Sequence, residues 1–297
     1  MEKYVAKTLS EYVSISTSIA SDIDDVWFRG HSSASHRLVP SALRETIPLT
    51  DGRGNNLKKG QMVNSGGGHV GGLDVEKMFF EFKSRALPFL DRNLENNFEW
   101  MFLMQHYGVP TRLLDWTTNA LVALYFAIGS NPYCVEKNGF EELSPEEDFM
   151  DEGELSLYGA AVFSLNPSEL NRKTVGCSSS IFICEDLDDW DHYFDPMSKE
   201  GVNNFLPIAV KSRHIDVRIR SQSGHFTLHG ANVWPLDYYD EIRKLLTKIF
   251  IPYGSVPQML KDLRSLGFTE SFIYPGLDSI AKEIKRNEGV AFSRRHF

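Results

Sequence analysis

The apolar run from Asn119 to Ile128 (NALVALYFAI) is the feature that most restricts how this chain can fold. Its residues are apolar on almost every side of a helix, so the run predicts a helix that the rest of the protein covers. Directly before it, Gln105 to Thr117 (QHYGVPTRLLDWT) holds a His, a Tyr, an Arg, an Asp and a Trp around a Gly and a Pro. Residues 97–106 predict another helix, whose Met and Phe side chains pack in the core. We therefore expect a polar loop between two core helices, a common position for a binding or catalytic site.

Hydrophobic periodicity over the rest of the chain predicts an α+β fold, in one domain that spans residues 1–297. We expect the N-terminal half to be mainly helical around one short strand at residues 26–31, and the C-terminal half to be rich in strands. Further helices are predicted at 5–20, 74–90, 256–266 and 277–284, and further strands at 157–165, 205–210, 217–219, 226–228, 246–252 and 272–274.

Two segments interrupt this pattern and predict surface insertions in the domain. Residues 50–72 are rich in Gly, Asn and Lys without an apolar period, and residues 131–156 are strongly acidic and rich in turn formers. A glycine loop that cradles phosphate is the alternative for residues 50–72. However, Gly66-Gly67-Gly68 lacks the GxxxxGK[ST] pattern of such a loop.

The composition excludes several classes of protein. A formal net charge of −9 and a pI of about 5.5 provide no global basic field for nucleic acid or for an anionic membrane. The longest apolar run, Ala120 to Ile128, is far shorter than the roughly 20 residues of a membrane span, and the N-terminus has no signal-peptide core. Three cysteines without a CxxC pair favour a reducing compartment, so we expect a cytoplasmic protein with no membrane partner.

Arg29 and Gly30 close the first predicted strand with an aromatic-Arg-Gly sequence. The guanidinium of Arg29 can make bidentate bonds to a phosphate or carboxylate, and Gly30 lets a ligand approach the backbone closely. Alternatively, Arg29 pairs with Asp115 or another acid and so joins the strand to the central loop.

The central stretch supplies most of the other candidate site residues. His106 is suited to general acid or base catalysis near neutral pH, or it caps the preceding helix. Tyr107 and Trp116 can stack on a flat base or on nicotinamide. Asp115 can activate a hydroxyl or a water, whereas its spacing of three from Arg112 also allows a buried structural pair between the two.

Gln222 is the last polar candidate, within Arg-Ser-Gln-Ser-Gly. Its amide either orients a ribose hydroxyl or an attacking group, or it bonds the backbone of a turn. His31, His225 and His229 lack the spacing of a metal-binding motif, so we predict no metal site.

Several of these stretches resemble the FRG domain, a family named for its Phe-Arg-Gly signature. The resemblance lies in Trp27-Phe28-Arg29-Gly30-His31-Ser32, Leu38-Val39-Pro40-Ser41 with Arg44, His106 to Thr117, Ala123 to Ala127, Arg220 to Phe226, Ile251-Pro252 and Tyr274 to Asp278. It covers most of the chain outside the two insertions. The family itself implies little about a reaction.

The first strand is also similar to the first NAD-binding strand of ADP-ribosyltransferases of the Arg-Ser-Glu type. This resemblance implies an ADP-ribosyltransferase-like fold, in which Arg29 supports a dinucleotide and Gln222 is the late residue that governs transfer. No stretch of the chain matches the middle aromatic-Ser-Thr-Ser strand of those enzymes.

These features lead to two hypotheses about function. The first is an NAD-dependent ADP-ribosyltransferase or NAD glycohydrolase that acts as a bacterial toxin or anti-phage effector, with a nucleotide-like substrate and a protein or nucleic-acid acceptor. The second is a non-catalytic module that senses a ligand or a phage component. The candidate catalytic residues are His106, Asp115 and Gln222, and the candidate ligand-binding residues are Arg29, Gly30, His31, Tyr107, Thr111, Arg112 and Trp116. Apart from NAD as a substrate, no cofactor is predicted.

Overall fold

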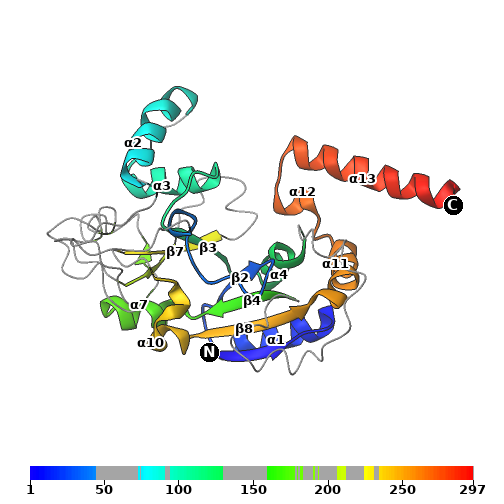
Figure 1. Cartoon of the computed structure of the whole chain (residues 1–297), viewed down its shortest axis with the longest axis horizontal. Helices are drawn as coiled ribbons and strands as arrows, with labels where there is room; N and C mark the ends of the chain where they lie inside the picture. The colour runs from blue at the N-terminus through cyan, green and yellow to red at the C-terminus, as the bar shows by residue number, and fades with distance from the viewer. Residues whose placement is uncertain are drawn as a thin grey trace, which may run out of the picture.

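A mixed β-sheet organises the chain, as the computed structural model shows (Figure 1). The structure describes residues 1–44, 73, 75–90, 94–129, 159–177, 179, 181–182, 190, 193, 206–211, 224–230 and 234–296. The strands in these ranges are β1 (Glu2–Val5), β2 (Trp27–His31), β3 (Leu113–Thr117), β4 (Gly159–Leu165), β5 (Ile181–Phe182), β6 (Ile208–Lys211), β7 (Gly224–Leu228) and β8 (Leu246–Pro252). They form one sheet in the order β1-β8-β4-β2-β3-β7-β6-β5, with β1 parallel to β8, β5 parallel to β6 and the other neighbours antiparallel.

The helices of the described residues lie along the whole chain. They are α1 (Leu9–Ser21), α2 (Val75–Ala86), α3 (Asn97–His106), α4 (Ala120–Ile128), α7 (Pro167–Val175), α10 (Asp240–Arg243), α11 (Val256–Ser265), α12 (Glu270–Ile273) and α13 (Leu277–His296), with short 3-10 turns η1 (Ser41–Leu43), η2 (Leu87–Phe89), η5 (Leu236–Tyr238) and η6 (Tyr253–Ser255). The predicted α+β class is confirmed. None of the described helices combines the length and the hydropathy that a membrane span requires.

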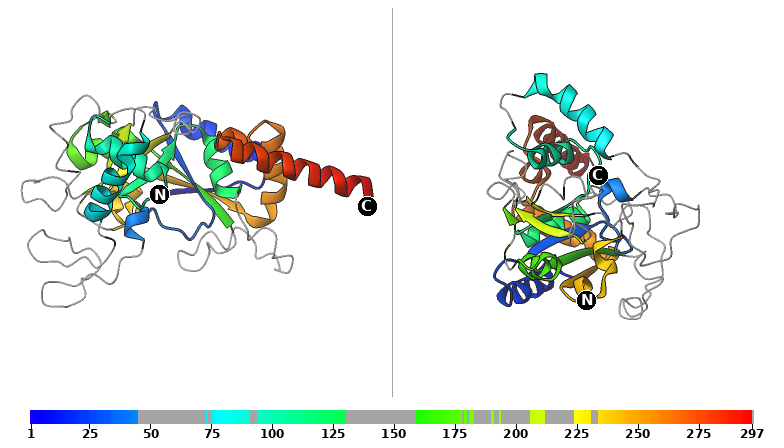
Figure 2. Two further views of the ribbon diagram at one scale, coloured as in Figure 1. Left: turned by 90° about the horizontal axis from the view of Figure 1, so that it is seen from above. Right: turned by 90° about the vertical axis from the view of Figure 1, so that its left-hand side faces the viewer.

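The sheet separates two layers of core packing. On one face, α1, α4 and α11 pack on β2, β4 and β8 around Phe28, Val162 and Ile249. On the opposite face, Trp27 and Trp116 belong to a second cluster that spans both halves of the sheet. A third cluster joins α3 to β3, β6 and β7, and Figure 2 shows α13 extending beyond the sheet and its layers.

Helix α4 lies directly on β2, and Gly30 makes this contact possible. A Cβ atom at Gly30 would lie 2.0 Å from the carbonyl oxygen of Ala123 and 2.6 Å from the amide nitrogen of Ala127. Asn119 begins the helix, because its side chain accepts from the amides of Leu121 and Val122. The helix thus occupies the space over Gly30 that we had assigned to a ligand, which corrects that expectation.

The central stretch differs most from the prediction. We expected a loop up to Thr117, but Leu113–Thr117 is strand β3, which pairs with β7 along its full length. Residues of a strand alternate between its two faces, so Asp115 is exposed between the buried Leu114 and Trp116. Only residues 107–112 remain as the connection from α3, and Gly108 makes its turn with φ of 77°.

Other segments also depart from the prediction. Residues 2–5 form β1 ahead of α1, where a helix over 5–20 was expected, and the predicted strand at 272–274 is wrong because Glu270–Ile273 is helical. The N-terminal half supplies three strands rather than one, whereas the predicted strand-rich C-terminal half is confirmed by β4 to β8. The predicted insertions at 50–72 and 131–156 and the predicted strand at 217–219 lie outside the described residues.

Replacing Gly30 with Ala should destabilise the protein, because the new methyl group overlaps the backbone of α4. We expect the free energy of unfolding in urea to fall by about 2–3 kcal/mol, the typical cost of overpacking. Gly254→Ala is the matched control, since its Cβ would meet nothing within 4 Å, and it should change stability by no more than about 0.5 kcal/mol. Equal stability of the two variants would contradict the close packing of α4 on β2.

Acid should weaken the fold through His229, which is fully buried. Burial, followed by the nearby charge of Arg112, lowers the pKa of His229 to about 3, whereas in the unfolded chain it is near 6.5. Between these values only the unfolded state binds the proton, so His229 lowers stability as the pH falls, by at most about 1.4 kcal/mol per pH unit. Urea unfolding from pH 7 to pH 4 should therefore show a smaller loss for His229→Gln than for wild type. If the two proteins lose the same free energy of unfolding over this range, the loss does not come from His229.

Candidate functional site

The sheet opens between its two central strands. β2 pairs with β4 along its whole length, and β3 pairs with β7 in the same way. In contrast, β2 and β3 share one residue pair, Phe28 with Thr117. Beyond that pair the two strands are not joined by a ladder, so the backbone groups along the opening need other partners.

Arg29 fills this opening. Its side chain is 13% exposed, and Nη1 donates to the backbone carbonyl of Asp115 at 2.5 Å. The same nitrogen lies 3.6 Å from the Asp115 carboxylate. Burial lowers the pKa of Arg29, and the charge of Asp115 opposes this effect. Arg29 therefore joins the two halves of the sheet by a charged contact in place of a backbone ladder.

His31 holds the guanidinium of Arg29 in place. Arg29 donates through Nε to His31 Nε2 at 3.0 Å, and His31 Nδ1 lies 3.1 Å from the carbonyl of His36. Because a carbonyl accepts, the imidazole proton lies on Nδ1. Burial, followed by the charge of Arg29, lowers the pKa of His31 well below its usual value, so the ring is neutral. Both ring nitrogens are engaged, which makes His31 a positioning residue for Arg29.

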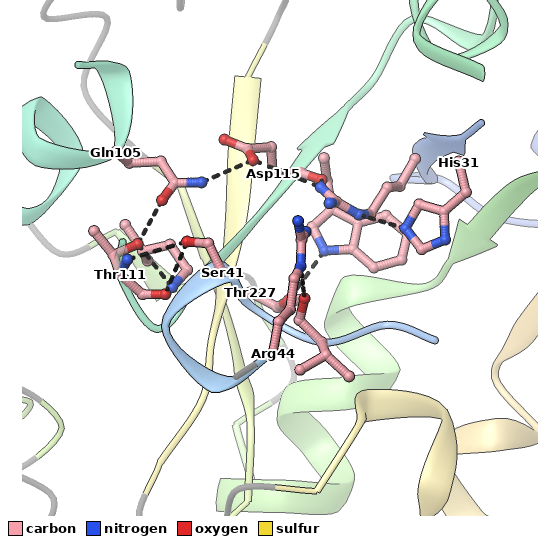
Figure 3. A network of polar contacts seen from close by, with 11 residues as sticks. His31, Ser41, Arg44, Gln105, Thr111, Asp115 and Thr227 are labelled. Carbon is pink, nitrogen blue, oxygen red and sulfur yellow. Dashed lines mark hydrogen bonds and ion pairs between the residues drawn. The ribbon is translucent and has the colours of Figure 1, made fainter. Parts of the chain in front are cut away.

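A chain of side-chain bonds fixes the carboxylate of Asp115 on the other side (Figure 3). Gln105 donates to Asp115 Oδ2 at 2.9 Å, and Thr111 donates to the amide oxygen of Gln105 at 2.5 Å. The amide of Thr111 donates in turn to Ser41 Oγ at 3.2 Å. The Asp115 side chain remains 57% exposed. No residue in the described ranges donates to its second oxygen, Oδ1, which is therefore open to a ligand.

Three of the candidate residues, Trp116, Arg112 and Gly30, are packed inside the protein in this structure. Trp116 is 2% exposed and donates through Nε1 to Thr227 Oγ1 at 3.0 Å, so its ring presents no face for stacking. Arg112 is also buried and donates to the backbone carbonyls of Tyr193, at 2.6 Å, and His229. Gly30 lies under α4.

Arg112 and Asp115 do not form the pair that their spacing had suggested. A separation of three residues brings side chains together on a helix, but in extended chain it places them on opposite faces. Arg112 turns into the core, whereas Asp115 turns outward to Arg29 and Gln105. Of the two ion pairs that the sequence suggested for Asp115, the structure contains the one with Arg29.

His106 and Tyr107 lie at the end of α3, next in sequence to Gln105. Their rings are 4.9 Å apart, and the ring of Tyr107 lies 6.4 Å from that of Phe82. Tyr107 is 67% exposed. Gln222 lies outside the described residues. Of the candidate residues, the structure thus brings together Arg29, His31, Thr111 and Asp115.

No sequence pattern had marked Gln105 or Arg44 as a site residue. Gln105 is part of a helix with a Met and Phe core pattern, and only the fold directs its amide to Asp115. Arg44 follows η1, and its charge adds to the effect of burial in lowering the pKa of Arg29. Arg44 falls within a stretch that resembles the family, whereas Gln105 lies directly before one, at the start of the polar stretch Gln105 to Thr117. Within the described ranges, no three His, Cys, Asp or Glu side chains gather as a metal site would require.

Comparison with known proteins identifies the central part of the chain. No curated protein and no solved structure matches it. Residues 24–133 match the family model of the FRG domain, and this range includes β2, α3, β3 and α4 with every residue of the polar network around Arg29 and Asp115. Residues 24–133 are therefore an FRG domain.

Proposed function

We propose that Arg29 and Asp115, which meet at the opening between β2 and β3, bind a small nucleotide-like molecule that carries phosphate. The observation that supports this proposal is the fixed pair of Arg29 and Asp115. A guanidinium has five N–H donors, and the hydrogen bonds to His31 and to the Asp115 carbonyl use two of Arg29's. The remaining donors are of the kind that binds phosphate oxygens in a bidentate geometry.

Asp115 adds a second type of recognition at the same place. Its open oxygen can accept from a ribose hydroxyl, as acidic residues do in many dinucleotide sites. Tyr107 offers an exposed ring on which a base or nicotinamide can stack. A cation beside a hydroxyl acceptor favours a nucleotide over a simple anion, and Tyr107 is the aromatic residue that we propose for stacking.

The enzymatic form of the proposal is NAD-dependent ADP-ribosyl transfer or NAD hydrolysis. The bond between ribose C1 and the nicotinamide nitrogen breaks, and nicotinamide leaves with the bonding electrons. Asp115 stabilises the positive charge that develops on the ribose. Water, or a nucleophile of a protein or nucleic-acid acceptor, then adds to C1 and loses its proton to His106, our predicted base, while Gln222 orients the attacking group. Such an activity fits a toxin or an anti-phage effector.

A non-catalytic sensing module is the second candidate, and the contacts of His31 and Asp115 favour it. Both ring nitrogens of His31 are engaged, and the carboxylate of Asp115 is paired with Arg29. This part of the site is thus built to hold a ligand rather than to move a proton. The two candidates share the same residues and differ in whether bound NAD is cleaved.

We also propose that the FRG domain extends over the whole chain, as the sequence suggested. The sheet continues on both sides of residues 24–133, because β1 precedes this range and β4 to β8 follow it. β2 and β3 lie at its centre, so the strands that carry the site depend on neighbours from outside the matched range.

Binding of NAD should depend on Arg29. Titration by calorimetry is expected to show that Arg29→Ala weakens NAD binding about 10- to 100-fold, since a hydrogen bond to a charged group contributes about 1.5–3 kcal/mol. Arg172→Ala is the control, because Arg172 is an exposed arginine on α7 that pairs with Glu169. If wild type does not bind NAD, or if both variants bind it equally well, the proposed site is wrong.

Cleavage of NAD should depend on the charge of Asp115. Asp115→Asn keeps an oxygen that can accept from Gln105 but removes the negative charge that would stabilise the ribose cation. For an enzyme, we expect release of nicotinamide by the wild type to fall at least about 100-fold in this variant while NAD binding changes little. Wild-type protein that binds NAD without releasing nicotinamide, with and without cell extract, would identify the sensing module instead.

A further inference from the structure

A cavity lies between α7 and the short elements η5 and α10, and Figure 1 shows α7 and α10 side by side. Its volume is about 840 Å³, within the range of roughly 300–1,000 Å³ that is typical of small-molecule sites. Lys173 of α7 lies 3.0 Å from the Glu241 carboxylate of α10, and this ion pair joins the two walls. Arg37, from the segment after β2, also lines the cavity, whereas Arg29 and Asp115 do not. The cavity is therefore separate from the site proposed above.

Asp237 fixes Arg37 at this cavity. The buried carboxylate of Asp237 accepts from Arg37 Nε at 2.5 Å and from the backbone amide of Leu38 at 3.1 Å. The Arg37 side chain is nevertheless 49% exposed, and its two terminal nitrogens have no hydrogen-bond partner in the described ranges. An arginine held through Nε keeps those nitrogens as a fork that matches the two oxygens of a carboxylate.

Tyr238 and Tyr239 add an aromatic wall to the same cavity. The ring of Tyr238 stacks on that of Trp234 at 5.2 Å, and the ring of Tyr239 lies edge-on to it at 5.5 Å. The hydroxyl of Tyr239 is buried and has no hydrogen-bond partner in the part of the chain that the structure describes. Burial raises the pKa of Tyr239, so this hydroxyl keeps its proton and can donate. A buried donor without a partner costs free energy, which a polar group of a ligand would recover.

The ion pairs around the cavity leave one positive charge among the described residues. Four basic side chains pair there with three carboxylates: Arg37 with Asp237, Arg243 with Asp240, and both Lys173 and Lys244 with Glu241. A ligand with a single negative charge balances this cluster. A dianion such as a phosphate monoester meets the repulsion of Asp240 and Glu241, which line the cavity themselves.

We propose that this cavity is a second binding site, for a small organic carboxylate with an aromatic or other apolar body. Arg37 binds the carboxylate through its two terminal nitrogens, and the rings of Tyr238 and Tyr239 pack against the body of the ligand. The inference goes beyond the proposed function and does not depend on it, because the two sites share no residue.

Titration of the full chain with benzoate, benzamide and phenyl phosphate tests this inference, with binding followed by the amide NMR signals. Wild type should bind benzoate at least tenfold more tightly than benzamide, its neutral analogue, and at least as tightly as phenyl phosphate. Signals of residues 173–174 and 238–243 should shift, and those of residues 113–117 in β3 should not. Arg37→Ala should weaken benzoate binding about tenfold or more, because the charge-assisted bonds are lost. Arg172→Ala is the control and should bind benzoate as wild type does.

Arg37→Ala also leaves the buried Asp237 with one partner fewer, so a thermal scan checks its fold. Arg37→Lys keeps the positive charge beside Asp237 but loses the fork, and it should weaken benzoate binding about three- to tenfold. The inference is wrong if benzoate binds no more tightly than benzamide, if the shifted signals lie outside this cavity, or if Arg37→Lys binds benzoate as wild type does. Tighter binding of phenyl phosphate than of benzoate would overturn the carboxylate as the ligand. None of these outcomes bears on NAD binding through Arg29.

Discussion

The contact between Arg29 and the backbone of Asp115 is the interaction on which the centre of this structure depends. In a continuous sheet, the backbone N–H and C=O groups of each strand form hydrogen bonds with the neighbouring strand. β2 and β3, however, share a single residue pair. The guanidinium of Arg29 bridges the remaining gap and is itself held by His31 and by the Asp115 carboxylate. A buried charge is tolerated when it has such partners, and here they come from both halves of the sheet.

The three signature residues of the FRG domain have different physical roles in this arrangement. Phe28 packs in the core under α4, and Gly30 leaves the space that the backbone of α4 occupies. Arg29 lies between them in sequence and points to the opposite face, where it spans the opening. Packing thus closes one face of β2, and polar contacts organise the other.

The sequence patterns correctly predicted the elements whose structure follows from their own residues. The run that became α4 is apolar on all sides, and the helix buries it as expected. β3 was missed because it has only five residues, and its pairing partner β7 lies more than a hundred residues later. Residues 272–274 have the aromatic and β-branched side chains of a strand, yet without a neighbouring strand they joined a helix. Short segments of this kind take their structure from their partners.

The sequence alone determined the family of the central segment and the α+β class, because these follow from residue types and their order, and it predicted Arg29 and Asp115 as site residues. The tertiary structure decided which polar groups meet. It directed Gln105 to Asp115 and turned Arg112 and Trp116 into the core. The physical reason is that a hydrogen bond or an ion pair acts over a few ångströms, and only the folded sheet sets those distances between residues far apart in the chain.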